Sequence, residues 1–240
     1  MAVLLACFAM WSVQVKGATV TWDATSGNGT LEDGGGNWDL SLTNWTTDAG
    51  VNNLLFTSGD DAIIGSGGAG GLVSLGENIT VGTLTFGVTS GGTYTISPTA
   101  AETLTINGGI SANETAAITA GITLGGAQSW TTATGKTLTI GGGVSNGGNL
   151  LTLNGAGNTV ISGIIGAGAG GLTQSGAGTV TLSGINTYSG TTTVSSGILR
   201  ATTSAAALGA GALSLGGGDL QLANDTGLNF GRNTTITGTS

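Results

Sequence analysis

The chain has 240 residues, of which 49 are glycine, 39% are hydrophobic and only 7% are charged. Disorder is excluded, because a disordered chain combines low hydrophobicity with high charge. The net charge of −8, with four Lys and Arg residues and no His, excludes nucleic-acid binding, which needs clustered cations. Cys7 is the single cysteine, so neither an intrachain disulfide nor a thiolate metal site can form.

An apolar run, AVLLACFAMWSV, opens the chain at residues 2–13. It is too short to span a bilayer but has the length of a signal-peptide core, and Val15 and Gly17 are small residues suited to a cleavage site. We expect residues 1–17 to be a signal peptide, although no basic residue precedes the run. Two alternatives stay open: a retained first strand, and a lipoprotein box in which Cys7 is acylated.

Residues 18–58 contain three of the five Trp residues, Trp22, Trp38 and Trp45, and several acidic residues. We interpret this segment as an N-terminal cap, because the end of a stack of strands exposes unpaired edges and core side chains. The alternative is an aromatic platform on which sugar rings stack.

Residues 59–240 are predicted to be short strands separated by glycine-rich turns. Apolar residues alternate with Thr or Ser, which is the pattern of a strand with one buried face. The composition, rich in Leu, Ile, Val, Thr and Gly, suits strands and turns and suits helices badly. The apolar pairs of these strands are Leu84 and Phe86, Leu104 and Ile106, Leu138 and Ile140, Leu151 and Leu153, Val180 and Leu182, Leu213 and Leu215, and Leu220 and Leu222.

Internal repeats decide the fold class. Residues 151–164 align without gaps on residues 172–185, an offset of 21, whereas the similar segments that begin at Thr103 and Thr137 are offset by 34. We therefore expect coils of about 20 residues and of varying length that stack as an all-β, right-handed parallel β-helix. An antiparallel sandwich is the alternative, but the short hairpin turns that it favours are sparse.

Residues 175–201, SGAGTVTLSGINTYSGTTTVSSGILRA, closely resemble the autotransporter-associated β-strand repeat. The pattern Gly-x-Gly-Thr-hydrophobic-Thr-Leu-Ser-Gly-x-Asn-Thr-Tyr-x-Gly is present from Gly176 to Gly190. The resemblance implies a passenger-type parallel β-helix that is exported and often adhesive, and it implies a location at the bacterial cell surface or outside the cell. The last residues, NFGRNTTITGTS, begin another strand, so we expect a fragment of a longer product, and the mode of anchoring stays open.

No catalytic, cofactor-binding or metal-binding residue is predicted. Asp60 and Asp61 are adjacent, and adjacent side chains on a strand point to opposite faces. Asp219 and Asp225 lie near one another in sequence, but Arg232 is the nearest cation. Asn186 is a candidate rung of an amide ladder between coils.

The predicted function is that of a non-enzymatic rod, which presents Thr and Ser for weak multivalent contacts with extracellular polysaccharide, with proteins of other cells or with itself. A carbohydrate-binding module or degenerate polysaccharide lyase is the second hypothesis. Ice binding is the third, and the irregular Thr spacing in the sequence disfavours it.

Overall fold

The computed structural model describes residues 17–166, 168–223 and 234–236. The described chain consists of short strands and one 3-10 turn, η1 (Ala205–Leu208), and most strand pairs are parallel. Apart from Gly17, the predicted signal peptide and Cys7 lie outside the described residues. Among the described residues, no helix has the length and apolar character needed to cross a membrane. The predicted all-β parallel solenoid is confirmed, and its right-handedness stays a prediction.

One wall of the solenoid is a sheet of nine parallel strands. Each strand lies on the strand of the preceding coil, so eight turns of chain separate the first from the last. At about 4.8 Å per strand the wall is roughly 40 Å long. In stacking order its strands are β2 (Gly36–Trp38), β6 (Leu72–Leu75), β8 (Tyr94–Pro98), β10 (Ala116–Ile118), β13 (Thr137–Ile140), β16 (Asn158–Ile161), β19 (Thr179–Leu182), β21 (Ile198–Thr202) and β23 (Asp219–Ala223).

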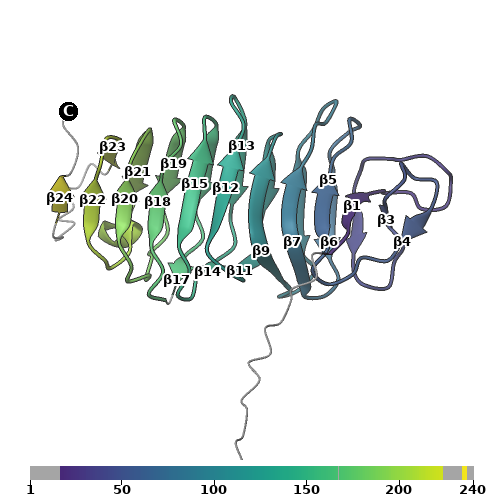
Figure 1. Ribbon diagram of the computed structural model, residues 1–240, viewed down its shortest axis with the longest axis horizontal. Coiled ribbons are helices and arrows are strands. Elements are labelled where there is room, and N and C mark those ends of the chain that lie inside the picture. Colours follow the sequence, from purple (N-terminus) through teal and green to yellow (C-terminus); the bar gives the residue numbers. More distant parts are fainter. Residues whose placement is uncertain (1–16, 167, 224–233, 237–240) are drawn as a thin grey trace, which may run out of the picture.

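A second sheet supplies the other walls, and its main path is called the long arm. Figure 1 shows these strands side by side along the long axis, from purple at the N-terminal end to yellow at the other. In stacking order they are β4 (Asn53–Leu54), β3 (Trp45–Thr46), β1 (Thr19–Trp22), β5 (Asp61–Ile64), β7 (Ile79–Phe86), β9 (Thr103–Ala112), β12 (Gln128–Thr132), β15 (Leu151–Gly155), β18 (Leu172–Gln174), β20 (Thr192–Val194), β22 (Leu213–Leu215) and β24 (Thr234–Ile236).

A third wall, the short arm, branches from β9 and continues through β11 (Gly121–Leu124), β14 (Val144–Ser145) and β17 (Ile165–Gly166). The two arms join in β9, whose first half pairs with β11 and whose second half pairs with β12. Gly109 lies where the halves meet and has a φ of +109°, a backbone conformation that glycine adopts without steric cost. One long strand therefore bends to serve two walls.

The core runs along the axis between the walls. The apolar pairs predicted to face inward are buried in β7, β9, β13, β15 and β19, while the intervening Thr residues lie toward solvent. Burying them drives folding at about 25 cal/mol per Å² of apolar surface. The prediction is wrong at the last described coil, where Leu222 in β23 is 50% exposed.

Coil length varies as predicted, but one of the two offsets behind that prediction does not measure a coil. Leu151 pairs with Leu172, which confirms the offset of 21. The segments at Thr103 and Thr137, however, lie in different sheets, because β9 belongs to the long arm and β13 to the nine-stranded sheet. Their offset of 34 is therefore not a coil length. The true variation is seen where Thr103 pairs with Gly121 and where Thr83 pairs with Gly109.

The N-terminal end of the long arm is closed by antiparallel strands. β1 pairs in parallel with β5 on one side and antiparallel with β3 on the other, and β3 pairs antiparallel with β4. Trp22, Trp38, Trp45 and Phe56 pack here with ring centroids 4.8–5.3 Å apart, and none is more than 2% exposed. Such rings offer no face to a sugar, so the aromatic-platform alternative is wrong. The boundaries 18–58 stay a prediction.

Candidate functional site

The acidic residues singled out in the sequence hold the backbone in place. Asp60 accepts hydrogen bonds from the Ala18 and Thr57 amides at 2.8 and 3.0 Å, and Asp61 accepts one from the Thr83 amide at 2.7 Å. Within the described ranges, no three His, Cys, Asp or Glu side chains gather as a metal site would require. Asp219 lies exposed in β23, whereas Asp225 and Arg232 fall outside the described residues. The Asp60 and Asp61 carboxylates therefore accept hydrogen bonds from the backbone.

Asp33 joins the cap to later coils. Its carboxylate accepts hydrogen bonds from the Tyr94 hydroxyl at 2.8 Å, from the Ser66 amide at 2.9 Å and from the Gly68 amide. Burial raises the pKa of Tyr94 above its usual range, and the nearby Asp33 carboxylate raises it further. The hydroxyl stays protonated and can keep donating to Asp33.

Acid should weaken the cap through Asp48, which accepts hydrogen bonds from Asn52 and Thr46 that lower its pKa below the ordinary 3.8. A folded-state pKa below the unfolded value means that the unfolded chain binds more protons at low pH, so this stability is complete above pH 3.8 and is lost as pH falls through the folded pKa. We expect the urea midpoint to fall less steeply below pH 4 in Asp48→Asn than in wild type.

Urea titrations at several pH values check this. Asn52→Ala removes the side-chain donor to Asp48 and keeps the backbone donor, so it should flatten the profile in part. Identical profiles for wild type and both variants would contradict it.

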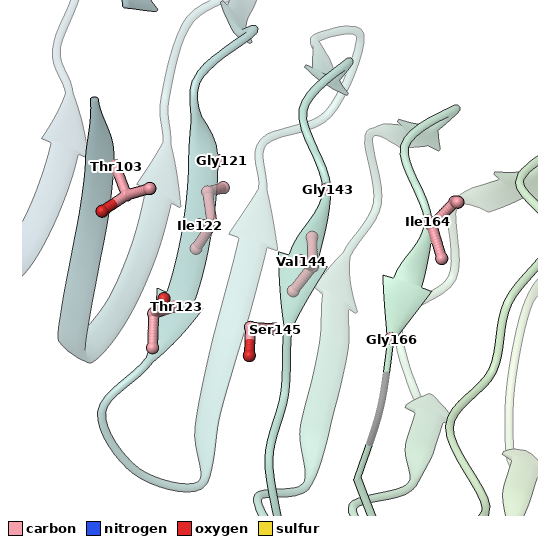
Figure 2. A pocket seen from close by; sticks show the side chains of 9 residues that line it. All are labelled: Thr103, Gly121, Ile122, Thr123, Gly143, Val144, Ser145, Ile164 and Gly166. Atoms are coloured by element: carbon pink, nitrogen blue, oxygen red, sulfur yellow. The ribbon is translucent and has the colours of Figure 1, made fainter. Parts of the chain in front are cut away.

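A shallow groove of about 290 Å³ crosses the outer face of the short arm. Figure 2 shows its residues on four successive coils: Thr103 on β9, Gly121 to Thr123 on β11, Gly143 to Ser145 around β14, and Ile164 and Gly166 around β17. Every lining residue is uncharged, and the groove combines hydroxyl groups with glycine and aliphatic surface. It is concave and open along the axis of the rod.

The groove is hollow because two glycines occupy outward strand positions where other residues would place a side chain. Pairing places Gly121 beside Thr103, and Ile122 beside Val144, so Gly143 follows Gly121 in the next coil. In the next coil the equivalent position is occupied by Ile164, which is 50% exposed. The missing side chains at the two glycines hollow the wall between Thr103 and Ile164. This groove was not predicted from the sequence, whose only local signal for it is glycine at an outward strand position.

Polar side chains in the segment around Asn186 join neighbouring coils from the inside. The Asn186 Oδ1 accepts a hydrogen bond from the Ile165 amide at 2.8 Å, and its Nδ2 donates to the Ala207 carbonyl. Tyr188 is fully buried, and its hydroxyl oxygen lies 2.7 Å from the Thr192 hydroxyl oxygen. The Thr192 hydroxyl donates a hydrogen bond to the Leu208 carbonyl. Asn186 is thus a single rung that joins its own coil to the preceding and the following coil.

The segment that contains Asn186 matches a known protein family. The passenger-associated-transport-repeat family matches residues 172–201. These residues are similar to a passenger-associated transport repeat. Together with the parallel β-solenoid, the match fits an autotransporter passenger repeat protein, as the sequence resemblance implied. No curated protein and no solved structure matches the chain.

The matched segment contains Asn186, whose removal leaves the Ile165 amide and the Ala207 carbonyl without this partner in the core. We expect Asn186→Ala to lower the free energy of unfolding by about 1–3 kcal/mol for each buried group left unpaired. Urea unfolding followed by circular dichroism measures it. The exposed Asn113→Ala is the matched control and should cost less than about 0.5 kcal/mol. Equal urea midpoints for the two variants would show that the hydrogen bonds of Asn186 do not contribute to the stability of the solenoid.

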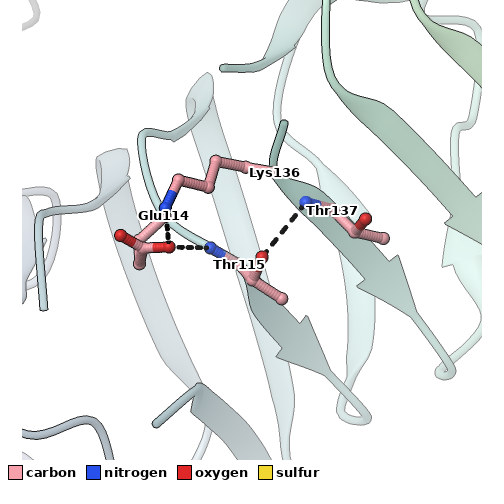
Figure 3. A network of polar contacts seen from close by, with 4 residues as sticks. All are labelled: Glu114, Thr115, Lys136 and Thr137. Carbon is pink, nitrogen blue, oxygen red and sulfur yellow. Dashed lines mark hydrogen bonds and ion pairs between the residues drawn. The ribbon is translucent and has the colours of Figure 1, made fainter. Parts of the chain in front are cut away.

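An ion pair links two coils that precede residues 172–201 (Figure 3). Lys136 Nζ donates to Glu114, which also accepts the Thr115 amide at 3.1 Å, and the Thr137 amide donates to the Thr115 hydroxyl at 3.3 Å. The hydrogen bond from Lys136 lowers the pKa of Glu114. One of the four basic residues of the chain is therefore engaged in joining the turns before β10 and β13.

Proposed function

We propose that this protein is an exported, non-catalytic passenger rod that is displayed at, or released from, the bacterial cell surface and makes adhesin-like contacts there. The observation that carries the proposal is the passenger-associated transport repeat at residues 172–201 within a continuous parallel solenoid. Because the family is a structural repeat of passengers, it supports a scaffold and not an enzyme.

The outer face of the long arm supports multivalent contact. Thr152, Thr173, Thr193 and Ser214 occupy one position in four successive strands, because their partners pair in register. The spacing that looks irregular in the sequence is thus regular in space, at about 4.8 Å per coil. Repeating weak hydroxyl contacts along a stiff rod raises avidity without a single strong pocket. We propose extracellular polysaccharide, surface proteins of other cells, or further copies of the chain as partners.

Labelling of intact cells tests display. With the native gene expressed in its bacterial host, an antibody against the solenoid should label unpermeabilised cells or detect the chain in the medium. Proteinase K added to intact cells should remove the surface signal. Deleting residues 2–13 should retain the chain in the cytoplasm, because these residues supply the predicted export signal. Labelling that appears only after lysis would refute the proposal.

A further inference from the structure

The groove of the short arm has the properties of a binding site that the fold does not require. Gly121 and Gly143 do not have the positive φ values that favour glycine, since neither lies between +20° and +160°. A methyl group at Gly121 would lie 3.5 Å from the Thr103 Cγ2, and one at Gly143 would lie 3.6 Å from the Ile164 oxygen, both ordinary packing distances. A methyl group would fit at both positions, so neither backbone conformation nor close backbone packing requires these two glycines.

The groove continues into apolar surface along the axis. Ile185 follows Ile164 by the 21 residues that separate the paired Leu151 and Leu172, and it is 61% exposed. Thr123 and Ser145 pair side by side along one edge of the groove and supply hydroxyl groups. Apolar surface and hydroxyls thus run together, parallel to the rod, over four strands or roughly 14 Å.

Charge and backbone pairing restrict the occupant. The lining residues carry no charge and the chain carries −8, so a polyanion would meet repulsion with no local cation to hold it. A peptide bound by strand addition needs an unpaired strand edge, but β11 is paired on both sides with β9 and β14, and β14 with β11 and β17. A sugar ring offers apolar C–H faces and hydroxyl edges, which the groove matches.

We propose that this groove binds an uncharged linear polysaccharide that lies parallel to the axis of the rod, with the sugar faces against Gly121 and Gly143 and with the Thr123 and Ser145 hydroxyls at its edge. This inference rests on the proposed display outside the cell, where such polymers are met. Successive coils repeat at nearly the length of one sugar residue, so one chain can make equivalent contacts on several coils.

Affinity electrophoresis of the full chain tests the proposal, with gels containing laminarin, hydroxyethyl cellulose or linear mannan as uncharged polymers and alginate as the charged one. We expect at least one uncharged polymer to retard the wild type and alginate to leave it unretarded. Gly121→Val and Gly143→Val fill the hollow and should weaken binding at least tenfold. Ile164→Ser, which removes an apolar wall, should weaken it as well.

Thr139→Val on β13 is the matched control, because it adds the same side chain at an outward strand position away from the groove, and it should bind like wild type. All variants should keep the wild-type urea midpoint, so that a loss of binding is not a loss of fold. No retardation by any uncharged polymer, equal retardation by alginate, or undiminished binding by Gly143→Val would overturn the groove as the site. Because cell labelling is separate, a displayed chain that fails to bind refutes this inference and not the proposed display.

Discussion

Gly163→Ala is expected to destabilise the solenoid strongly, although it adds a single methyl group. Gly163 is buried at a corner where its coil lies directly on the preceding one, and a methyl group there would overlap the Gly142 carbonyl oxygen. Relief requires a backbone shift in two coils whose strands are fixed by pairing on both sides. Overpacking of this kind costs about 1–3 kcal/mol or more.

The urea midpoint of the purified chain measures this effect, and Gly143→Ala is the matched control. Gly143 lies in the same region, but its added methyl group would meet its nearest neighbour at 3.6 Å, so we expect a change below about 0.5 kcal/mol. A midpoint for Gly163→Ala within error of the control would show that the coils are not packed as closely as the structure indicates.

Trp45→Ala is expected to be the most damaging change in the cap. Trp45 has no exposed surface and packs against Trp22, Trp38 and Phe56. It also lies in β3, which covers the edge of β1. Truncating a buried Trp costs about 3–5 kcal/mol.

The loss should also open the edge of β1, because an uncovered strand edge invites pairing with another chain. Urea unfolding and sedimentation velocity should therefore show both a lower midpoint and new oligomers. Val51→Ala in the same cap removes an exposed side chain, 67% of which is accessible, and should leave both measurements unchanged. A stable, monomeric Trp45→Ala chain would mean that the cap is dispensable.

Local patterns in the sequence predicted the walls well. Leu84 and Phe86 are buried as their alternation with Thr indicates, because a strand presents its side chains to opposite faces in turn. The offset of 21 between residues 151 and 172 was confirmed because a gap-free repeat stacks equivalent residues. These features depend on neighbours in sequence or on exact repetition.

Features that depend on distant residues were not predictable. Similar segments at Thr103 and Thr137 lie in different sheets, since strand chemistry does not specify which wall a strand joins. The contact of Asp33 with Tyr94 spans 61 residues and has no local pattern. The groove arises from the pairing of Gly121 and Gly143 with Thr103 and Ile164 across coils, and glycine alone signals turns far more often than hollows.

Because the coils differ in length, the number of residues in the chain does not determine the length of the rod. Thr103 reaches its partner Gly121 in 18 residues and Thr83 reaches Gly109 in 26, yet each coil advances the stack by one strand spacing. Extra residues must therefore project sideways at the corners. Insertions and deletions at the corners can therefore change the loops on the surface of the solenoid without changing its length along the axis. Evolution can vary these surface loops while the stacked strands stay the same.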